Sequence, residues 1–213
     1  MLEEYIYISD DGISTKICDN ILTYYHSNKN SMYKGVTRAG KDAKVKDTTD
    51  IHLRMNAKGY GADILNIVSD VLGMHLKTYT SLHPEYKYYE KILLTEGVLI
   101  QRYKKNEGKY VYHTDMSYEV NENILIETNK LNLCRNTLNN LKEKYPITKR
   151  VLTFIIYLND IDEGGETEFF THCRVKPKAG TIIFFPALWY YNHSGLMPVS
   201  HDKYILTGWL YAS

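Results

Sequence analysis

Two stretches in the first half of the chain carry apolar residues at the spacing of an amphipathic helix. Apolar side chains recur from Ile17 to Tyr25 at intervals of three and four residues, which predicts a helix over residues 14–27. The same periodicity predicts a second helix over residues 61–80. Neither helix carries residues that suggest chemistry, so we expect both to pack against a sheet.

From about residue 97 onward the pattern changes to short strands. β-Branched and aromatic residues bounded by turn residues predict strands at residues 97–103, 110–113, 151–158, 167–170, 181–185 and 203–211. Strands of this length, joined by glycine-containing turns, indicate an antiparallel sandwich or barrel. A polar, basic stretch at residues 34–50 indicates an exposed loop, and helical spacing at residues 129–145 indicates an inserted helix.

The composition is that of a globular protein. Of the 213 residues, 44% are hydrophobic and 24% are charged, close to the average for soluble domains, and no linker divides the sequence. We expect a single domain, with residues 1–96 as a supporting region of helices and strands and residues 97–213 as the core. The chain has 20 tyrosines and many Ile, Asn and Lys, a bias that AT-rich codons of a viral or low-GC microbial genome would produce.

The net charge, the short apolar runs and the cysteines limit the possible partners and the cellular location of the protein. A net charge of +1 gives no field that would draw the chain to nucleic acid or to an anionic membrane. The apolar runs are far shorter than the ~20 residues of a membrane helix, and the acidic N-terminus does not resemble a signal peptide. Three widely spaced cysteines fit a reducing compartment. We therefore expect a cytoplasmic protein, with its oligomeric state left open.

The first candidate for chemistry is the pair His113 and Asp115. Side chains two apart on a strand point to the same face, so this imidazole and this carboxylate are expected side by side. Such a pair supplies two of the three ligands in the 2-His-1-carboxylate site of non-haem Fe(II), which leaves positions open for a co-substrate and O₂. The alternative is a surface histidine beside a turn aspartate, which is the commoner case for such a pair alone.

A second group of residues near the C-terminus favours the metal site over that alternative. His193 ends an apolar segment, a turn follows, and Lys203 opens the next strand. If these segments pair as adjacent antiparallel strands, the Lys203 ammonium comes within a few ångströms of a metal on the face that His193 occupies. A lysine there can pair with the distal carboxylate of an oxo-diacid that chelates iron. Taken singly, a core histidine and a solvated lysine would explain both residues.

Six segments of the second half form one ordered pattern. They are Arg102-Tyr103, Gly108-x-Tyr110-x-x-His113-x-Asp115, Arg150-x-x-Thr153-x-x-x-Tyr157-Leu158-Asn159, Glu163-Gly164-Gly165-Glu166-Thr167-x-Phe169, Val175-x-Pro177-Lys178-x-Gly180 and His193-x-Gly195-x-x-Pro198-Val199. Together with Lys203, these segments resemble the iron and 2-oxoglutarate dependent dioxygenases, and most closely the prolyl 4-hydroxylase branch. The resemblance covers roughly residues 97–211.

The resemblance implies a mainly β fold whose core is a double-stranded β-helix, or jelly roll, with the N-terminal helices packed on the larger sheet. It implies that His113, Asp115 and His193 bind Fe(II), with 2-oxoglutarate and O₂ as co-substrates and ascorbate as a reductant. It also implies residues for the two organic ligands: Lys203, Tyr103, Thr153 and Trp209 for 2-oxoglutarate, and Tyr110 for a peptide substrate.

The implied reaction is hydroxylation of a peptidyl proline, which yields succinate and CO₂ from 2-oxoglutarate. The same chemistry on a free amino acid, another small metabolite or a nucleobase is one alternative, and a non-catalytic β-helix binding module is another. The chain departs from the family pattern at residues 119–149, and one extra residue separates Tyr103 from His113. Asp115 argues against the halogenase branch, where a small residue at this position makes room for chloride.

Overall fold

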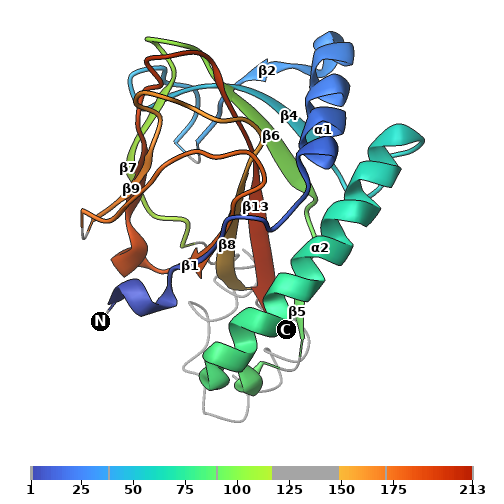
Figure 1. The fold of residues 1–213 in the computed structure, drawn as a ribbon, viewed down its shortest axis with the longest axis vertical. Coiled ribbons are helices and arrows are strands. Elements are labelled where there is room, and N and C mark those ends of the chain that lie inside the picture. The colour runs from blue at the N-terminus through green and yellow to red at the C-terminus, as the bar shows by residue number, and fades with distance from the viewer. Residues whose placement is uncertain (1, 38, 90, 117–148, 171, 213) are drawn as a thin grey trace, which may run out of the picture.

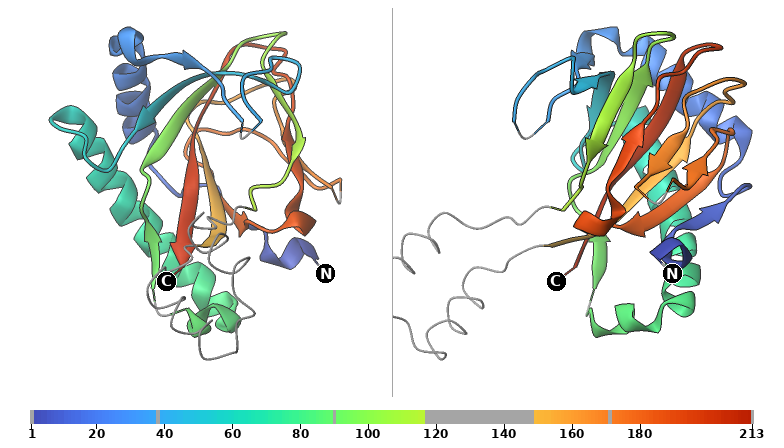
Figure 2. Two further views of the ribbon diagram at one scale, coloured as in Figure 1. Left: turned by 180° about the vertical axis from the view of Figure 1, so that it is seen from behind. Right: turned by 90° about the vertical axis from the view of Figure 1, so that its left-hand side faces the viewer.

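Two antiparallel β-sheets face each other, and two long helices cover the outer face of the larger sheet (Figures 1 and 2). The computed structural model describes residues 2–37, 39–89, 91–116, 149–170 and 172–212. The helices are α1 (Thr15–Ser27) and α2 (Tyr60–Leu82). Short 3₁₀ helices are η1 (Leu2–Tyr5), η2 (Lys29–Ser31), η3 (Pro84–Tyr88) and η4 (Trp189–Tyr191).

The sheets are built from strands that are distant in sequence. The larger sheet has the order β1 (Tyr7–Ser9), β11 (Ile182–Pro186), β8 (Lys149–Tyr157), β13 (Lys203–Ala212), β6 (Val98–Tyr103), β4 (Thr49–Leu53) and β2 (Tyr33–Lys34), and β5 (Ile92–Leu94) also pairs with β13. The smaller sheet has the order β10 (Arg174–Val175), β9 (Thr167–Phe169), β12 (His193–Gly195), β7 (Lys109–His113) and β3 (Lys46–Asp47).

The larger sheet is buried on both faces, which explains its nearly continuous apolar strands. Along β8, Phe154 and Ile156 point to the helices, whereas Ile155 and Tyr157 point between the sheets. The side chains therefore form two apolar clusters, one under the helices and one inside the sandwich. Among the described residues, no helix is long and apolar enough to cross a lipid bilayer.

The predicted fold class is confirmed: the structure is mostly antiparallel sheet with two helices, close to residues 14–27 and 61–80 where periodicity predicts them. The six predicted strands are present as β6, β7, β8, β9, β11 and β13. The helix predicted at residues 129–145 lies outside the described residues. The division into a supporting region and a core stays a prediction, although β1 to β4 of the first region join both sheets.

The prediction of an exposed loop at residues 34–50 is wrong at its ends. Strands β3 and β4 begin there, and Lys46 and Asp50 are buried, with 6% and 1% of their surface exposed. Their side chains pair, with Nζ 3.0 Å from Oδ2. Charged residues are rarely buried unless they are paired. Because the pairing is not visible in the sequence, Lys46 and Asp50 indicate a surface loop there rather than buried strands.

Candidate active site

Cross-strand pairing brings the two predicted histidine ligands together. His193 on β12 is the direct partner of His113 on β7, and their ring centres are 4.3 Å apart. Asp115 follows the end of β7, so its position does not depend on strand alternation as predicted. Its two carboxylate oxygens lie 3.8 Å from Nε2 of His113 and 3.6 Å from Nε2 of His193. These ligand atoms all lie within 4.8 Å of one another.

Each imidazole is fixed through its other nitrogen. Nδ1 of His113 bonds the carbonyl oxygen of Val111 at 2.9 Å, and Nδ1 of His193 bonds that of Tyr191 at 3.0 Å. Because a carbonyl only accepts, each Nδ1 carries the hydrogen and each Nε2 offers a lone pair toward Asp115. Backbone carbonyls orient metal-binding histidines in this way in many proteins. The donor set therefore fits Fe(II).

The charges of the three groups also suit a metal. Burial, and next the charge that His193 would carry, lower the pKa of His113 to about 3, so this imidazole is neutral at pH 7. Burial alone would raise the pKa of Asp115. The positive charges that His193 and His113 carry when protonated, together with the donors of Thr153 and Trp209, outweigh burial and lower it, so the group is a carboxylate.

Two side chains of the larger sheet reach Asp115 from the adjacent pair of strands β8 and β13. Thr153 is the cross-strand partner of Trp209, and its Oγ1 donates to Oδ2 of Asp115 at 2.8 Å. The indole N–H of Trp209 is buried and close enough to help lower the pKa of Asp115, yet it forms no regular hydrogen bond among the described residues. Thr153, predicted for the co-substrate, thus orients a metal ligand in this structure.

A β-bulge places Tyr110 beside the same site. His193 pairs with His113, but Gly195 pairs with Tyr110, so β7 contains one more residue than β12 over this stretch. Residues three apart on a regular strand face opposite sides, whereas here the Tyr110 and His113 rings stack with centres 3.5 Å apart. The Tyr110 ring therefore lies in direct contact with the metal-ligand candidate His113.

Lys203 is a buried cation inside the sandwich. Only 1% of its surface is exposed, and burial lowers its pKa to about 7, although Glu166 raises it. Its Nζ donates to the carbonyl oxygen of Gly165 at 2.8 Å and forms no ion pair with a carboxylate of the described residues. Gly164 and Gly165 both have positive φ, 71° and 76°, which glycine adopts readily and which directs this carbonyl to the lysine.

Tyr103 connects Lys203 with the histidine strand. It is the cross-strand partner of Lys203, whose Nζ lies 4.1 Å from its ring centre. A Cβ added at Gly195 would lie 3.0 Å from the Tyr103 ring, so the ring also packs against β12 two residues beyond His193. The prediction that the His193 and Lys203 segments are adjacent strands is wrong: β12 and β13 belong to different sheets, and Tyr103 contacts both strands.

Sequence reasoning missed three buried polar residues of the same interior, namely Lys46, Asp50 and Gln101. Gln101 lies two residues before Tyr103 and shares its face of β6, with 4% of its surface exposed. Alternation along residues 97–103 could have placed Gln101 next to Tyr103, but nothing in the sequence joins it to Asp50.

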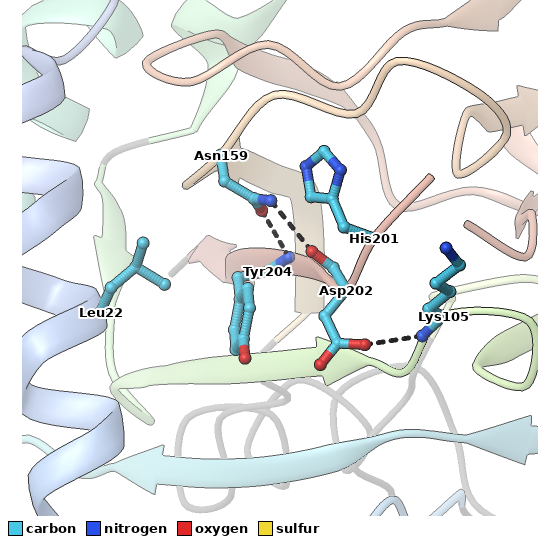
Figure 3. Close-up of a pocket in the computed structure, with 6 residues that line it drawn as sticks. All are labelled: Leu22, Lys105, Asn159, His201, Asp202 and Tyr204. Atoms are coloured by element: carbon cyan, nitrogen blue, oxygen red, sulfur yellow. Dashed lines mark hydrogen bonds between the residues drawn. The ribbon is translucent and has the colours of Figure 1, made fainter. Parts of the chain in front are cut away.

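A separate open pocket of about 420 Å³ lies at the turn before β13 and includes His201, the nearest alternative ligand to His193 in sequence (Figure 3). Its polar groups bond one another: Asn159 Nδ2 donates to the Asp202 carbonyl at 2.9 Å, and the Lys105 amide donates to Asp202 Oδ1 at 2.7 Å. His201 bonds the Asp160 carbonyl and is not part of the ligand cluster. These contacts fix the start of β13, where Lys203 lies.

The comparisons with known proteins agree with this geometry. The model of the 2OG-Fe(II) oxygenase superfamily matches residues 98–211, more than half of the 213-residue chain. This chain belongs to that superfamily. It is a 2-oxoglutarate-dependent dioxygenase that uses Fe(II), and the resemblance predicted from the motifs is confirmed. Among curated proteins, the sequence search found no relative.

Solved structures of prolyl hydroxylases share its fold. The viral collagen prolyl hydroxylase of Paramecium Bursaria Chlorella virus-1, bound to 2-oxoglutarate, is 21% identical with a TM-score of 0.62 over 98% of this chain and 96% of that one. A prolyl-4-hydroxylase of Pseudomonas putida is 12% identical, with a TM-score of 0.63 over 96% and 91%. A prolyl hydroxylase of Trichoplax adhaerens, bound to a hypoxia inducible factor peptide, is 15% identical, with a TM-score of 0.63 over 98% and 83%.

Removal of His193 tests the ligand set. We expect His193→Ala to weaken Mn(II) or Fe(II) binding by more than the roughly 10–100-fold that loss of an outer partner costs. His201→Ala is the matched control and should bind metal as the unmodified protein does, because its ring faces another pocket. Anaerobic calorimetric titration measures both. Full metal binding by His193→Ala, or its loss in His201→Ala, would contradict the assignment.

Proposed function

We propose that this dioxygenase hydroxylates a proline residue within a peptide or protein. His113, Asp115 and His193 hold the iron, and Lys203 binds the far carboxylate of 2-oxoglutarate with Tyr103 beside it. With Fe(II), 2-oxoglutarate and O₂ bound, such a site couples the conversion of 2-oxoglutarate to succinate and CO₂ to the hydroxylation of a C–H bond.

The observation that carries the co-substrate assignment is the unpaired burial of Lys203. A buried ammonium normally has a carboxylate partner, whereas among the described residues this one contacts a backbone carbonyl and an aromatic ring and pairs with no carboxylate. A ligand carboxylate would complete the pair. Because Tyr103 packs against both Lys203 and the strand of His193, a dicarboxylate held by this lysine has its other end directed toward the metal ligands.

Thr153 positions one metal-ligand candidate, and buried aromatic rings shield the site. The Thr153 hydroxyl holds Asp115 in one orientation, so the carboxylate cannot turn away from the imidazoles. Buried rings of the inner cluster, including Phe169 and Phe185, pack near His193 with ring centres 5.8 and 4.7 Å from it. They exclude water from that side of the site, which strengthens the electrostatic interactions inside it.

Aromatic side chains around the histidines support a proline-containing substrate. Tyr110 stacks on His113, and Trp189 and Tyr190 of η4, 59% and 45% exposed, precede His193 closely in the chain. The exposed Phe170 donates its amide to the Asn192 carbonyl, next to His193. Aromatic-lined surfaces are the usual docking sites for proline-rich segments. The three structural neighbours described above are named prolyl hydroxylases, which supports the same substrate class.

A substrate screen tests this proposal. The Fe(II)-loaded protein is incubated with 2-oxoglutarate and O₂ and with a peptide library that has a central proline or, as a control, alanine. We expect succinate formation to rise only with the proline library, together with the gain of one oxygen on that residue by mass spectrometry. Hydroxylation only of free amino acids, small metabolites or nucleobases would overturn it, and so would 2-oxoglutarate turnover that no peptide stimulates.

Lys203 tests the co-substrate site separately. Loss of one member of a buried pair costs ~3–5 kcal/mol, so we expect Lys203→Ala to weaken 2-oxoglutarate binding by roughly two to three orders of magnitude. Lys203→Arg should recover only part, because its planar fork is longer than an ammonium. Metal binding should not change, since Lys203 is not a ligand. Titrations of Mn(II)-loaded variants measure this, and an affinity within about twofold of the unmodified protein would contradict it.

The lowered pKa of Lys203 makes co-substrate binding depend on pH. Near Lys203 lie the Tyr103 ring and the Glu166 carboxylate, and burial outweighs Glu166 to bring the pKa to about 7. Above pH 7 the free amine is neutral, so binding of a carboxylate must take up a proton. We expect the affinity for 2-oxoglutarate to fall between pH 7 and 9 by up to about tenfold per unit.

Calorimetry in buffers with different ionisation enthalpies measures this proton uptake directly. At pH 8 the unmodified protein should take up nearly one proton per 2-oxoglutarate bound, and Lys203→Arg, which stays charged, should take up none. Binding heats that do not depend on the buffer, with an affinity that is flat from pH 7 to 9, would show that Lys203 keeps an ordinary pKa.

A further inference from the structure

A buried ion pair joins the two sheets inside the sandwich. Lys46 belongs to β3 of the smaller sheet and Asp50 to β4 of the larger sheet. Their side chains are 5% and 2% exposed, and Nζ lies 3.0 Å from Oδ2. Such pairs add little net stability, because removal of two charges from water offsets their attraction. The contacts of the pair therefore point to a role other than stability.

The Asp50 carboxylate sets the orientation of Gln101. The two residues are cross-strand partners, and Gln101 Nε2 donates to Asp50 Oδ2 at 3.2 Å. Because a carboxylate only accepts, the amide nitrogen must face Asp50 and the amide oxygen must face away. That oxygen, Oε1, accepts from the Tyr103 hydroxyl at 3.4 Å. The same oxygen, Asp50 Oδ2, also accepts from Lys46 Nζ at 3.0 Å.

The series of contacts ends at the proposed co-substrate site. Tyr103 is buried and lies directly opposite Lys203, whose Nζ is 4.1 Å from its ring centre. The bond to Gln101 is long, so the hydroxyl hydrogen can turn to a charged acceptor while the ring keeps its place. Gln101 thus limits where the hydroxyl oxygen lies but does not prevent it from donating to a carboxylate.

We propose that Lys46, Asp50 and Gln101 are positioning residues for 2-oxoglutarate, which act through the Tyr103 hydroxyl. This inference rests on the proposed roles of Tyr103 and Lys203. The ion pair holds Gln101 in one orientation, and Gln101 fixes the hydroxyl end of the ring that lies against the Lys203 ammonium, so only the hydroxyl hydrogen has to turn when the far carboxylate binds. These hydrogen bonds include no metal-ligand candidate, although Lys46 Nζ also lies 5.2 Å from the centre of the Tyr110 ring that stacks on His113.

A double-mutant cycle tests the inference, with binding to the anaerobic Mn(II)-loaded protein as the readout. Gln101→Met keeps the volume and removes the hydrogen bonds, and should weaken 2-oxoglutarate binding by about two- to tenfold, because the Tyr103 hydroxyl is no longer held in place before the carboxylate binds. In a Tyr103→Phe background the same change should have no further effect. Pyruvate, which chelates in the same way but lacks the far carboxylate, should bind the unmodified protein and the Gln101→Met variant equally.

Two further variants complete the design. Lys104→Met, which removes an exposed ion pair with Glu107 just after β6, is the matched control and should leave 2-oxoglutarate binding unchanged. Lys46→Met with Asp50→Leu replaces the ion pair by apolar side chains, a change that folds tolerate. It should weaken 2-oxoglutarate binding as Gln101→Met does, and should add nothing to that variant.

The outcomes separate this inference from the proposed function. Additive effects of Gln101→Met and Tyr103→Phe, or equal weakening of pyruvate and 2-oxoglutarate, would overturn the positioning role alone. If neither Tyr103→Phe nor Lys203→Ala changes 2-oxoglutarate binding, the co-substrate assignment itself fails, and the positioning role fails with it.

Discussion

The pairing of β7 with β12 is the constraint on which the rest of this site depends. It makes His113 and His193 direct partners, and backbone carbonyls two residues before each ring take up the Nδ1 hydrogens. Both Nε2 lone pairs consequently converge before any ligand arrives. A metal site assembled this way loses little conformational freedom on binding, which is the basis of preorganisation. Asp115 completes the set from the segment that leaves the strand.

The second requirement is a dry interior that still contains polar groups. The helices cover the outer face of the larger sheet, so its inner face can carry residues such as Lys203, Gln101 and Thr153. Each of these has a partner: a glycine carbonyl, the Asp50 carboxylate and the Asp115 carboxylate. The ammonium of Lys203, the one charged group of these three, has no counter-ion among the described residues. An incoming dicarboxylate therefore meets one cation at the far end and the ligand cluster at the other.

Much of this arrangement follows from local sequence, and the rest from tertiary contacts. Runs of β-branched and aromatic residues bounded by turns predicted the apolar strands, and motif order predicted the ligand set His113, Asp115 and His193, whose side chains lie together in the structure. Alternation could not reveal the bulge that turns Tyr110 toward His113, because a bulge depends on the partner strand. It also failed for Lys46 and Asp50, whose charges indicate solvent until the pairing across two sheets is known. The same limit explains why β12 and β13 were expected to be neighbours.

The residues of the proposed site are placed in two ways, by strand pairing and by irregular backbone. The proposed iron and 2-oxoglutarate residues Lys203, Thr153 and His193 belong to paired strands, where one change of register would move every side chain to the other face. Tyr110 depends on a bulge, and Trp189 and Tyr190 lie on a short 3₁₀ helix, where changes disturb less of the ladder. Prolyl hydroxylases that are 12% to 21% identical to this chain keep the frame over nearly all its length. Changes at the irregular positions would therefore alter the surface beside the site while the paired strands of the frame stay in place.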